Sequence, residues 1–172
     1  AAARGNIPAP AAGAGAAAAA PAPGQDDGFT KELLQDIMPL MQKKFRILTG
    51  PDNTAIAGLS MGGAQSLRTG LAHLETFHYV IGLSSAVGMG GGRGAAPAGG
   101  AAPAAAPPDP TAAYPALMAD VAGANKKLKL FALYCGKQDS LVINGNKALS
   151  AALLAKGVKL QYTETEGGHW FI

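Results

Sequence analysis

The sequence has little of several residue types, and each shortage excludes a class of protein. The only cysteine among the 172 residues is Cys135, which excludes an intramolecular disulfide and a metal centre built from several cysteines. Aromatic residues make up only 6% of the chain, so few large side chains are available to fill a core. No apolar run approaches the length that crosses a bilayer, so we expect no membrane partner.

Clustered charge is also lacking. The 14 Lys and Arg residues are scattered, the formal net charge is +3 and the pI is near 9.1. A nucleic-acid-binding surface gathers basic residues on one face, so we expect no nucleic-acid partner. No signal peptide is visible, because residues 1–23 have neither a basic start nor a leucine-rich middle.

Two stretches rich in Ala, Gly and Pro divide the chain. Residues 1–28 form a low-complexity arm, and residues 88–110 read as a flexible insertion, because prolines interrupt any helix and few large side chains are present to bury. The 48% of apolar residues therefore overstates the core. We expect one catalytic domain over residues 29–172, with the insertion on its surface.

Strand and helix patterns alternate in the remaining sequence. Short apolar runs and one alternating run predict strands at 55–59, 79–83, 129–135 and 158–165. Helical spacing predicts helices at 30–45, 62–74, 115–122 and 146–156. We expect Thr30 to cap the first helix and Pro39 to kink or split it. This alternation predicts an α/β fold with a mostly parallel sheet and helices on both faces.

The strongest motif is the G-x-S-x-G of residues 58–62, between a predicted buried strand and a predicted helix. A serine on a tight strand-to-helix turn stands clear of its neighbours, and flanking glycines let the backbone close that turn. We therefore expect Ser60 to be a nucleophile. The N–H of Met61, at the start of the helix, is the expected donor to the oxyanion of a tetrahedral intermediate.

A serine nucleophile needs a base and a group that orients the base, and Asp139 and His169 are the expected pair. Each follows a predicted strand, and together with Ser60 they occur in the chain order Ser, acid, His. Taken singly, Asp139 could be a turn or cap residue and His169 a solvated loop residue. Trp170 either walls the acyl pocket or packs, and we favour the pocket. The candidates that fit this scheme less well are Asp52, His73, His78, Asp120 and Cys135.

Two runs of sequence resemble a known family. FTKELLQDIMPLMQKKFRILTGPDNTAIAGLSMGGAQSLRTGLAHLETFHYVIGLSSA and KLKLFALYCGKQDSLVINGNKALSAALLAKGVKLQYTETEGGHWF resemble the esterases that include feruloyl and acetyl-xylan esterases, enterochelin esterases and S-formylglutathione hydrolases. The resemblance implies an α/β-hydrolase fold, here a partial version carrying the C-terminal half, with Ser60, Asp139 and His169 as the triad. It also favours an extracellular or periplasmic location, since the similar plant-polysaccharide esterases are typically exported.

The expected function is that of a serine carboxylic ester hydrolase that works through an acyl-enzyme, on acyl or feruloyl esters of carbohydrates. The triad supplies nucleophile, base and acid, so we expect no metal and no organic cofactor. An alternative within enzymes is hydrolysis of a siderophore ester or a thioester. An alternative of another class is a truncated, non-catalytic remnant that acts as a binding protein. An exposed sheet edge beside the nucleophile strand would favour self-association.

Overall fold

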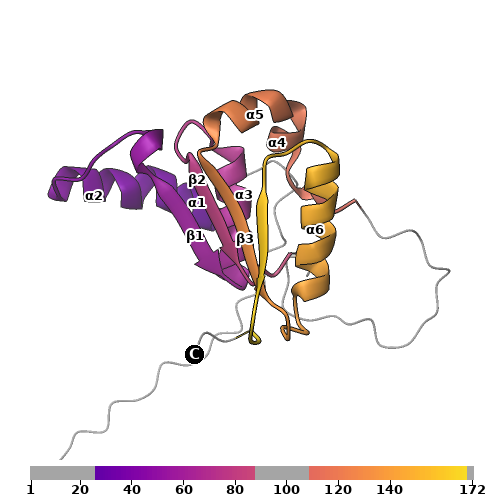
Figure 1. Cartoon of the computed structure of the whole chain (residues 1–172). Helices are drawn as coiled ribbons and strands as arrows, with labels where there is room; N and C mark the ends of the chain where they lie inside the picture. The colour runs from indigo at the N-terminus through magenta and orange to yellow at the C-terminus, as the bar shows by residue number, and fades with distance from the viewer. Residues whose placement is uncertain (1–25, 88–108, 170–172) are drawn as a thin grey trace, which may run out of the picture.

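A four-stranded parallel sheet forms the centre of the computed structural model, which describes residues 26–87 and 109–169 (Figure 1). The strands are β1 (Ala55–Leu59), β2 (Tyr79–Leu83), β3 (Leu130–Gly136) and β4 (Gln161–Thr165), in the order β1-β2-β3-β4. All neighbours are parallel, and the register aligns Leu59 with Leu83 and Leu83 with Tyr134. The carboxyl ends of the strands therefore meet at one edge of the sheet. The predicted insertion lies almost wholly outside the described residues, as does most of the low-complexity arm.

Helices connect these strands in the predicted alternation. The connections use α3 (Met61–Ala72), α4 (Pro115–Ala119), α5 (Val121–Lys127) and α6 (Ile143–Ala155). Ahead of β1 lie α1 (Gly28–Glu32), the π-helical turn η1 (Leu33–Ile37) and α2 (Met38–Lys44); η2 (Pro51–Asn53) and η3 (Pro110–Ala113) are 3-10 turns. No helix within the described residues is both long enough and apolar enough to span a membrane.

The core lies between the sheet and the connecting helices. Ile56, Val80, Phe131 and Leu133 are buried on alternate strand positions that share one sheet face, and they belong to one cluster with side chains of α3 and α6. A Cβ on Gly70 of α3 would approach the Val80 side chain to 2.8 Å, so α3 packs closely on β2. On the opposite face of the edge strand β1, Ala55 and Ala57 are exposed. Within the described ranges, the helical layer thus covers the face that carries Ile56 and Val80.

The start of the first helix differs from the prediction. Asp27, not Thr30, is the N-cap: its side chain accepts a hydrogen bond from the Thr30 N–H at 2.8 Å. Thr30 is instead buried, with its hydroxyl 2.7 Å from the Thr69 hydroxyl of α3. The helix is split as expected near Pro39, which lies in the first turn of α2 directly after the π-helical turn.

The boundaries in the second half of the chain also differ. The predicted helix at 115–122 is two short helices, because Asp120 interrupts it and caps α5 by accepting from the Gly123 N–H at 2.8 Å. The helix α6 begins at Ile143 rather than at 146, and β4 begins at Gln161 rather than at 158. These shifts leave the order of the elements as predicted.

Candidate active site

Ser60 lies on a strained turn between β1 and α3. Its backbone angles are φ 57° and ψ −117°, a conformation that non-glycine residues rarely adopt. A Cβ on Gly58 would lie 2.3 Å from the Gly62 carbonyl, and a Cβ on Gly63 would lie 2.9 Å from the Gly58 oxygen. A Cβ on Gly62 would meet nothing within 4 Å. The turn thus has no room for a Cβ atom at positions 58 and 63. At Gly62 a Cβ atom would fit without a contact, so the turn does not need glycine there.

Hydrogen bonds join Ser60, His169 and Asp139, the three residues that the sequence predicted as a triad. The Nε2 atom of His169 is 2.9 Å from the Oγ of Ser60, and its Nδ1 is 2.8 Å from the Oδ2 of Asp139. Ser60 follows β1, Asp139 follows β3 and His169 follows β4, all at the carboxyl edge of the sheet. The fold thus brings His169 into contact with Ser60, which is 109 positions away in the sequence, and with Asp139, which is 30 positions away.

Asp139 is well placed to orient an imidazole. Its side chain is fully buried, and burial by itself raises the pKa of a carboxyl. The hydrogen bond to His169, the nearby Ser84 hydroxyl and the charge of His169 outweigh this effect and hold the pKa of Asp139 below its ordinary value. Asp139 is therefore an anion at neutral pH. Its second oxygen, Oδ1, has no partner of normal hydrogen-bond geometry within the described residues, although the Ser84 hydroxyl lies near the carboxyl.

The loop after β2 supports the turn from the other side. The N–H of Ala86 donates to the Ser60 oxygen at 2.8 Å, and the N–H of Ser60 donates to the Leu83 oxygen at 2.9 Å. Asn146 of α6 is fully buried, and its Nδ2 donates to the Ser85 oxygen at 2.8 Å. Sequence reasoning missed this loop and Asn146. The signal for the loop was two serines at the carboxyl end of a predicted strand, whereas nothing in the local sequence marked Asn146.

The loop that carries His169 is fastened to the loop that carries Asp139. A Cβ on Gly136 would lie 2.4 Å from the Gly167 oxygen, so the two backbones touch. Gln138 binds Gly167 twice: its N–H donates to the Gly167 oxygen at 3.0 Å, and its Oε1 accepts from the Gly167 N–H at 2.6 Å. Lys137 and Glu166 form an ion pair across the same gap. These contacts fix the path of the chain just before His169.

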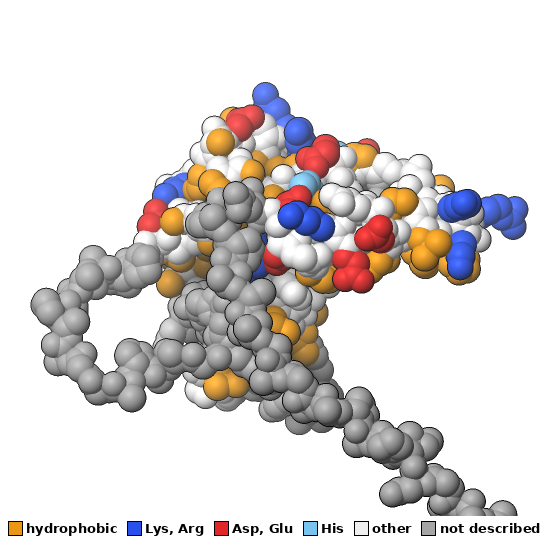
Figure 2. All heavy atoms as spheres, turned by 180° about the vertical axis from the view of Figure 1, so that it is seen from behind, with side chains coloured by type: hydrophobic (Ala, Val, Ile, Leu, Met, Phe, Trp, Pro, Cys, Tyr) orange, Lys and Arg blue, Asp and Glu red, His pale blue; other side chains and the backbone are white. Residues whose placement is uncertain are grey.

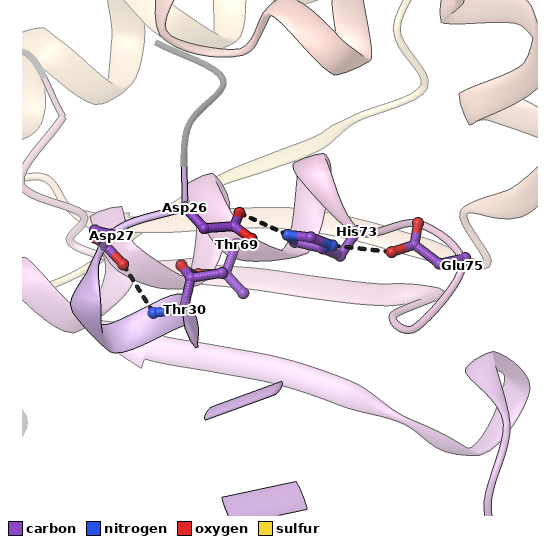
Figure 3. Close-up of polar contacts among 6 residues, drawn as sticks. All are labelled: Asp26, Asp27, Thr30, Thr69, His73 and Glu75. Atoms are coloured by element: carbon purple, nitrogen blue, oxygen red, sulfur yellow. Dashed lines mark hydrogen bonds and ion pairs between the residues drawn. The ribbon is translucent and has the colours of Figure 1, made fainter. Parts of the chain in front are cut away.

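The competing candidates lie apart from this line. His73, the C-cap residue of α3, lies 2.8 Å from Asp26 and 2.9 Å from Glu75 (Figure 3). His78 contacts Asp52 at 2.5 Å, before the start of β2. Cys135 is buried, and burial raises the pKa of its thiol. It is a core residue rather than a reactive thiol.

Met61 and Trp170 are the remaining predicted site residues. Met61 is the first residue of α3, so its N–H is one of the N–H groups that have no acceptor within the helix, and the residue is 70% exposed. Trp170 lies outside the described residues. No group of three or more His, Cys, Asp or Glu side chains that could hold a metal ion occurs in residues 26–87 and 109–169.

Comparison with known families identifies the family of the chain. The model of the family described as "Putative esterase" matches residues 3–171. The chain belongs to this esterase family. The resemblance seen in the sequence is thereby confirmed.

Solved structures of three esterases or hydrolases are similar to the chain. They are a ferulic acid esterase (25% identity, TM-score 0.60), S-formylglutathione hydrolase from Staphylococcus aureus (22%, 0.57) and the enterobactin esterase of Shigella flexneri (22%, 0.56). The alignments cover 83%, 78% and 82% of this chain, and 55%, 51% and 33% of those proteins. The fold is that of the α/β-hydrolase esterases, as expected. The chain spans about half the length of the first relative, and carries part of that fold.

Proposed function

We propose that this esterase-family chain is a serine carboxylic ester hydrolase in which Ser60 is the nucleophile, His169 the general base and acid, and Asp139 the group that orients His169. The observation that carries the proposal is the unbroken line of hydrogen bonds from the Asp139 carboxylate through the His169 ring to the Ser60 hydroxyl. A line of this kind, with a buried anion at one end and a strained serine at the other, suits acyl transfer.

The geometry supports a two-step mechanism. His169 Nε2 takes the proton of Ser60 as Oγ attacks the ester carbonyl, and the Asp139 anion stabilises the imidazolium that forms. The N–H of Met61 donates to the developing oxyanion. His169 then gives the proton to the leaving alcohol, and an acyl-enzyme remains. Water, activated by the same ring, attacks the acyl-enzyme and releases the acid and free Ser60.

The proposed substrates are acyl or feruloyl esters of carbohydrates. The family assignment and the 25%-identical ferulic acid esterase support this class. Esters of a siderophore and thioesters are the alternatives within the same chemistry, because an enterobactin esterase and an S-formylglutathione hydrolase share the fold. We place Trp170, the residue after the base, at the acyl pocket. A panel of feruloyl, acetyl, siderophore and thiol esters of matched leaving-group pKa would rank these classes by kcat/KM.

A fluorophosphonate probe tests the nucleophile directly, because it reacts covalently with an activated serine. We expect labelling of the chain at Ser60 and none of the Ser60→Ala variant. The matched control is Ser150→Ala, which removes a hydroxyl on α6 that donates to the Lys147 oxygen and lies outside the triad. Labelling that persists in Ser60→Ala would show that another residue is the nucleophile.

A non-catalytic binding protein is the second candidate. It is favoured by the outer edge of β1, which has no strand partner in the described part of the chain, because an unpaired strand can bind another chain. A sample that is folded by circular dichroism but takes up no probe would support this candidate and overturn the hydrolase. The probe experiment therefore separates the two functions.

A further inference from the structure

Ser84 has a strained backbone directly after β2. Its φ is 40°, and within the described residues Ser60 is the other non-glycine residue with a positive φ. Glycine would adopt such a conformation without strain, so it is the side chain that distinguishes serine at this position. Backbone strain of this kind is concentrated at active sites, where surrounding contacts hold it in place. Ser84 is therefore a candidate for a role at the site that contains Ser60.

The Ser84 side chain is buried against β3. The N–H of Ser84 donates to the Tyr134 oxygen at 2.7 Å, and its hydroxyl donates to the Sγ atom of Cys135 at 3.9 Å. The residue is only 5% exposed. Because sulfur is a weak acceptor, this contact satisfies the hydroxyl poorly. The hydroxyl hydrogen can therefore turn toward a better acceptor nearby.

The better acceptor is the carboxylate of Asp139. Ser84 follows β2 and Asp139 follows the neighbouring strand β3, so the Ser84 hydroxyl lies beside this carboxylate. Oδ2 of Asp139 binds His169, whereas Oδ1 is buried and has no hydrogen-bond partner in the described part of the chain. A buried carboxylate oxygen without a donor is costly, and a hydrogen bond to an ionised acceptor is stronger than one to a neutral group. A turn of the Ser84 hydroxyl from Sγ to Oδ1 satisfies both groups.

Groups from the ends of β2, β3 and β4 and from the loop of Asp139 itself face the carboxyl. They are the hydroxyl of Ser84, the thiol of Cys135, the ring of His169 and the backbone N–H of Leu141. The thiol is a weak donor. The Leu141 N–H is fixed by the backbone and forms no hydrogen bond of normal geometry with Oδ1. The Ser84 hydroxyl can rotate, so it is the donor best suited to Oδ1.

The loop that carries Ser84 is itself held in place. The buried Asn146 donates from Nδ2 to the Ser85 oxygen at 2.8 Å, and the N–H of Ala86 donates to the Ser60 oxygen at 2.8 Å. The same short loop thus contacts the backbone of Ser60 and lies beside the carboxyl of Asp139. A hydroxyl on this loop keeps its place relative to both ends of the triad.

We propose that Ser84 is a positioning residue of the triad, whose hydroxyl donates to Oδ1 of Asp139 and fixes the plane of the carboxylate that holds His169. This role rests on the function proposed above for Ser60, His169 and Asp139. A carboxylate held at one oxygen alone can turn about its Cβ–Cγ bond, because that torsion has broad minima. The imidazole that it holds would turn with it. Ser84 is buried away from substrate, so it acts through Asp139 on kcat and leaves KM unchanged.

Two variants separate the hydroxyl from the backbone. Ser84→Ala and Ser84→Gly both remove the hydroxyl, and each is expected to lower kcat for an activated aryl ester by about tenfold, with KM and circular dichroism unchanged. Ser84→Gly also relieves the strained φ, so its urea midpoint is expected to be no lower than that of Ser84→Ala. The matched control is Ser150→Ala, which removes another buried hydroxyl, on α6, and is expected to keep the wild-type kcat.

A second measurement does not need activity. Carbon-13 NMR of the full chain, labelled at aspartate carboxyls, follows the titration of Asp139, and the Asp139→Asn variant assigns its signal. The pKa of Asp139 is expected to be higher in Ser84→Ala than in the wild type, because a donor that stabilises the anion has been removed. Ser150→Ala is expected to titrate like the wild type.

Three outcomes would overturn the role of Ser84. They are an unchanged titration of Asp139 in Ser84→Ala, a wild-type kcat in Ser84→Gly, and an equal loss of kcat in Ser150→Ala. Failure of the proposed function would look different, because the folded wild-type chain would then take up no fluorophosphonate and hydrolyse no ester. In that case the titration of Asp139 alone decides whether the Ser84 hydroxyl binds its carboxylate.

Discussion

The carboxyl end of β1 and the outer edge of the same strand are held in different ways. At the carboxyl end, Ser60 is bonded to Leu83, Ala86 and His169, and Asp139 is fully buried. Along the outer edge, residues 28–48 expose most of their apolar side chains, and Figure 2 shows a hydrophobic patch beside the Lys and Arg side chains of this segment. This segment contacts the body through Leu33, Leu34 and Met38, which pack against the core, and through polar contacts between the start of α1 and α3. In the first region, packing and hydrogen bonds hold the side chains in one fixed geometry. In the second region, the outer edge of β1 has no strand partner within residues 26–87 and 109–169.

The polar contacts of the second region form a small latch between α1 and α3. Asp27 binds Arg68 at 2.8 Å, and the hydroxyls of Thr30 and Thr69 are 2.7 Å apart. Figure 3 shows Asp27 with Thr30 and Thr69. Asp26, next to them in sequence, contacts His73. The ion pairs of Asp27 and Asp26 in this latch are part-exposed, and ion pairs of this kind contribute little to stability. The comparison therefore predicts large effects for changes at the carboxyl end of β1 and small effects for changes at the ion pairs of the latch.

The largest effect is expected for Asp139→Asn. The neutral amide no longer stabilises the imidazolium, and its NH₂ favours the wrong tautomer of His169, so kcat should fall by about 10⁴-fold. Steady-state hydrolysis of an activated aryl ester measures this loss. The control is Asp120→Asn, an N-cap residue on α5 that is remote from the triad. A loss of less than tenfold for Asp139→Asn would mean that this carboxyl does not orient the base.

A substitution at Gly58 should come next. A Cβ there would lie 2.3 Å from the Gly62 backbone, so Gly58→Ala forces the turn open and should lower the free energy of unfolding by several kcal/mol, of the order of 4. Urea denaturation followed by circular dichroism gives the value. Gly62→Ala is the matched control and should keep wild-type stability or gain a few tenths of a kcal/mol, because its Cβ has free space in a helix. Equal losses for both variants would contradict the geometry of the turn.

The smallest expected effect is the pH dependence of the free energy of unfolding that His73 contributes at the latch. Burial lowers the pKa of His73, but Asp26 and Glu75 outweigh it and raise the pKa above its usual range. Because the folded pKa exceeds the unfolded one, the stabilisation is complete below the unfolded pKa of about 6.5 and is lost as pH rises through the folded pKa. The groups that face the ring are Asp26 from the segment before α1 and Glu75 after α3.

Urea denaturation at a series of pH values measures the stabilisation by protonated His73. It should stay below about 1 kcal/mol because the ring and its partners are part-exposed. At pH values below the unfolded pKa, His73→Gln should be less stable than the wild type. As pH rises through the folded pKa of His73, this difference in the free energy of unfolding should disappear. The control His78→Gln changes a second paired histidine, which lies away from both the latch and the triad. A wild type that gains stability from His73 as pH rises would reverse the sign and contradict the ion pairs.

Local sequence patterns predicted most of the elements because the strands are short, apolar and bounded by turns. The runs at 55–59 and 79–83 are strands with those boundaries. The predicted cap at Thr30 was wrong, because Asp27 supplies the oxygen while Thr30 is buried against α3. The same local pattern fits either cap, and only packing against α3 decides between them. The exposed side chains of α2 were likewise not evident, since helical spacing shows which residues share a face but not whether anything covers it.

By itself, the sequence determined the order of the elements, the esterase family and the chain order of Ser60, Asp139 and His169, since these depend on local patterns and on motif spacing. Only the tertiary structure decided the 2.8 and 2.9 Å contacts that join the three residues, and the roles of Ala86, Asn146 and Gly63 around them. It also decided that the side chains of Ala55 and Ala57 on β1 stay exposed among the described residues. The physical reason is that these features depend on distances between segments far apart in the chain, which the register of a parallel sheet sets and no local pattern contains.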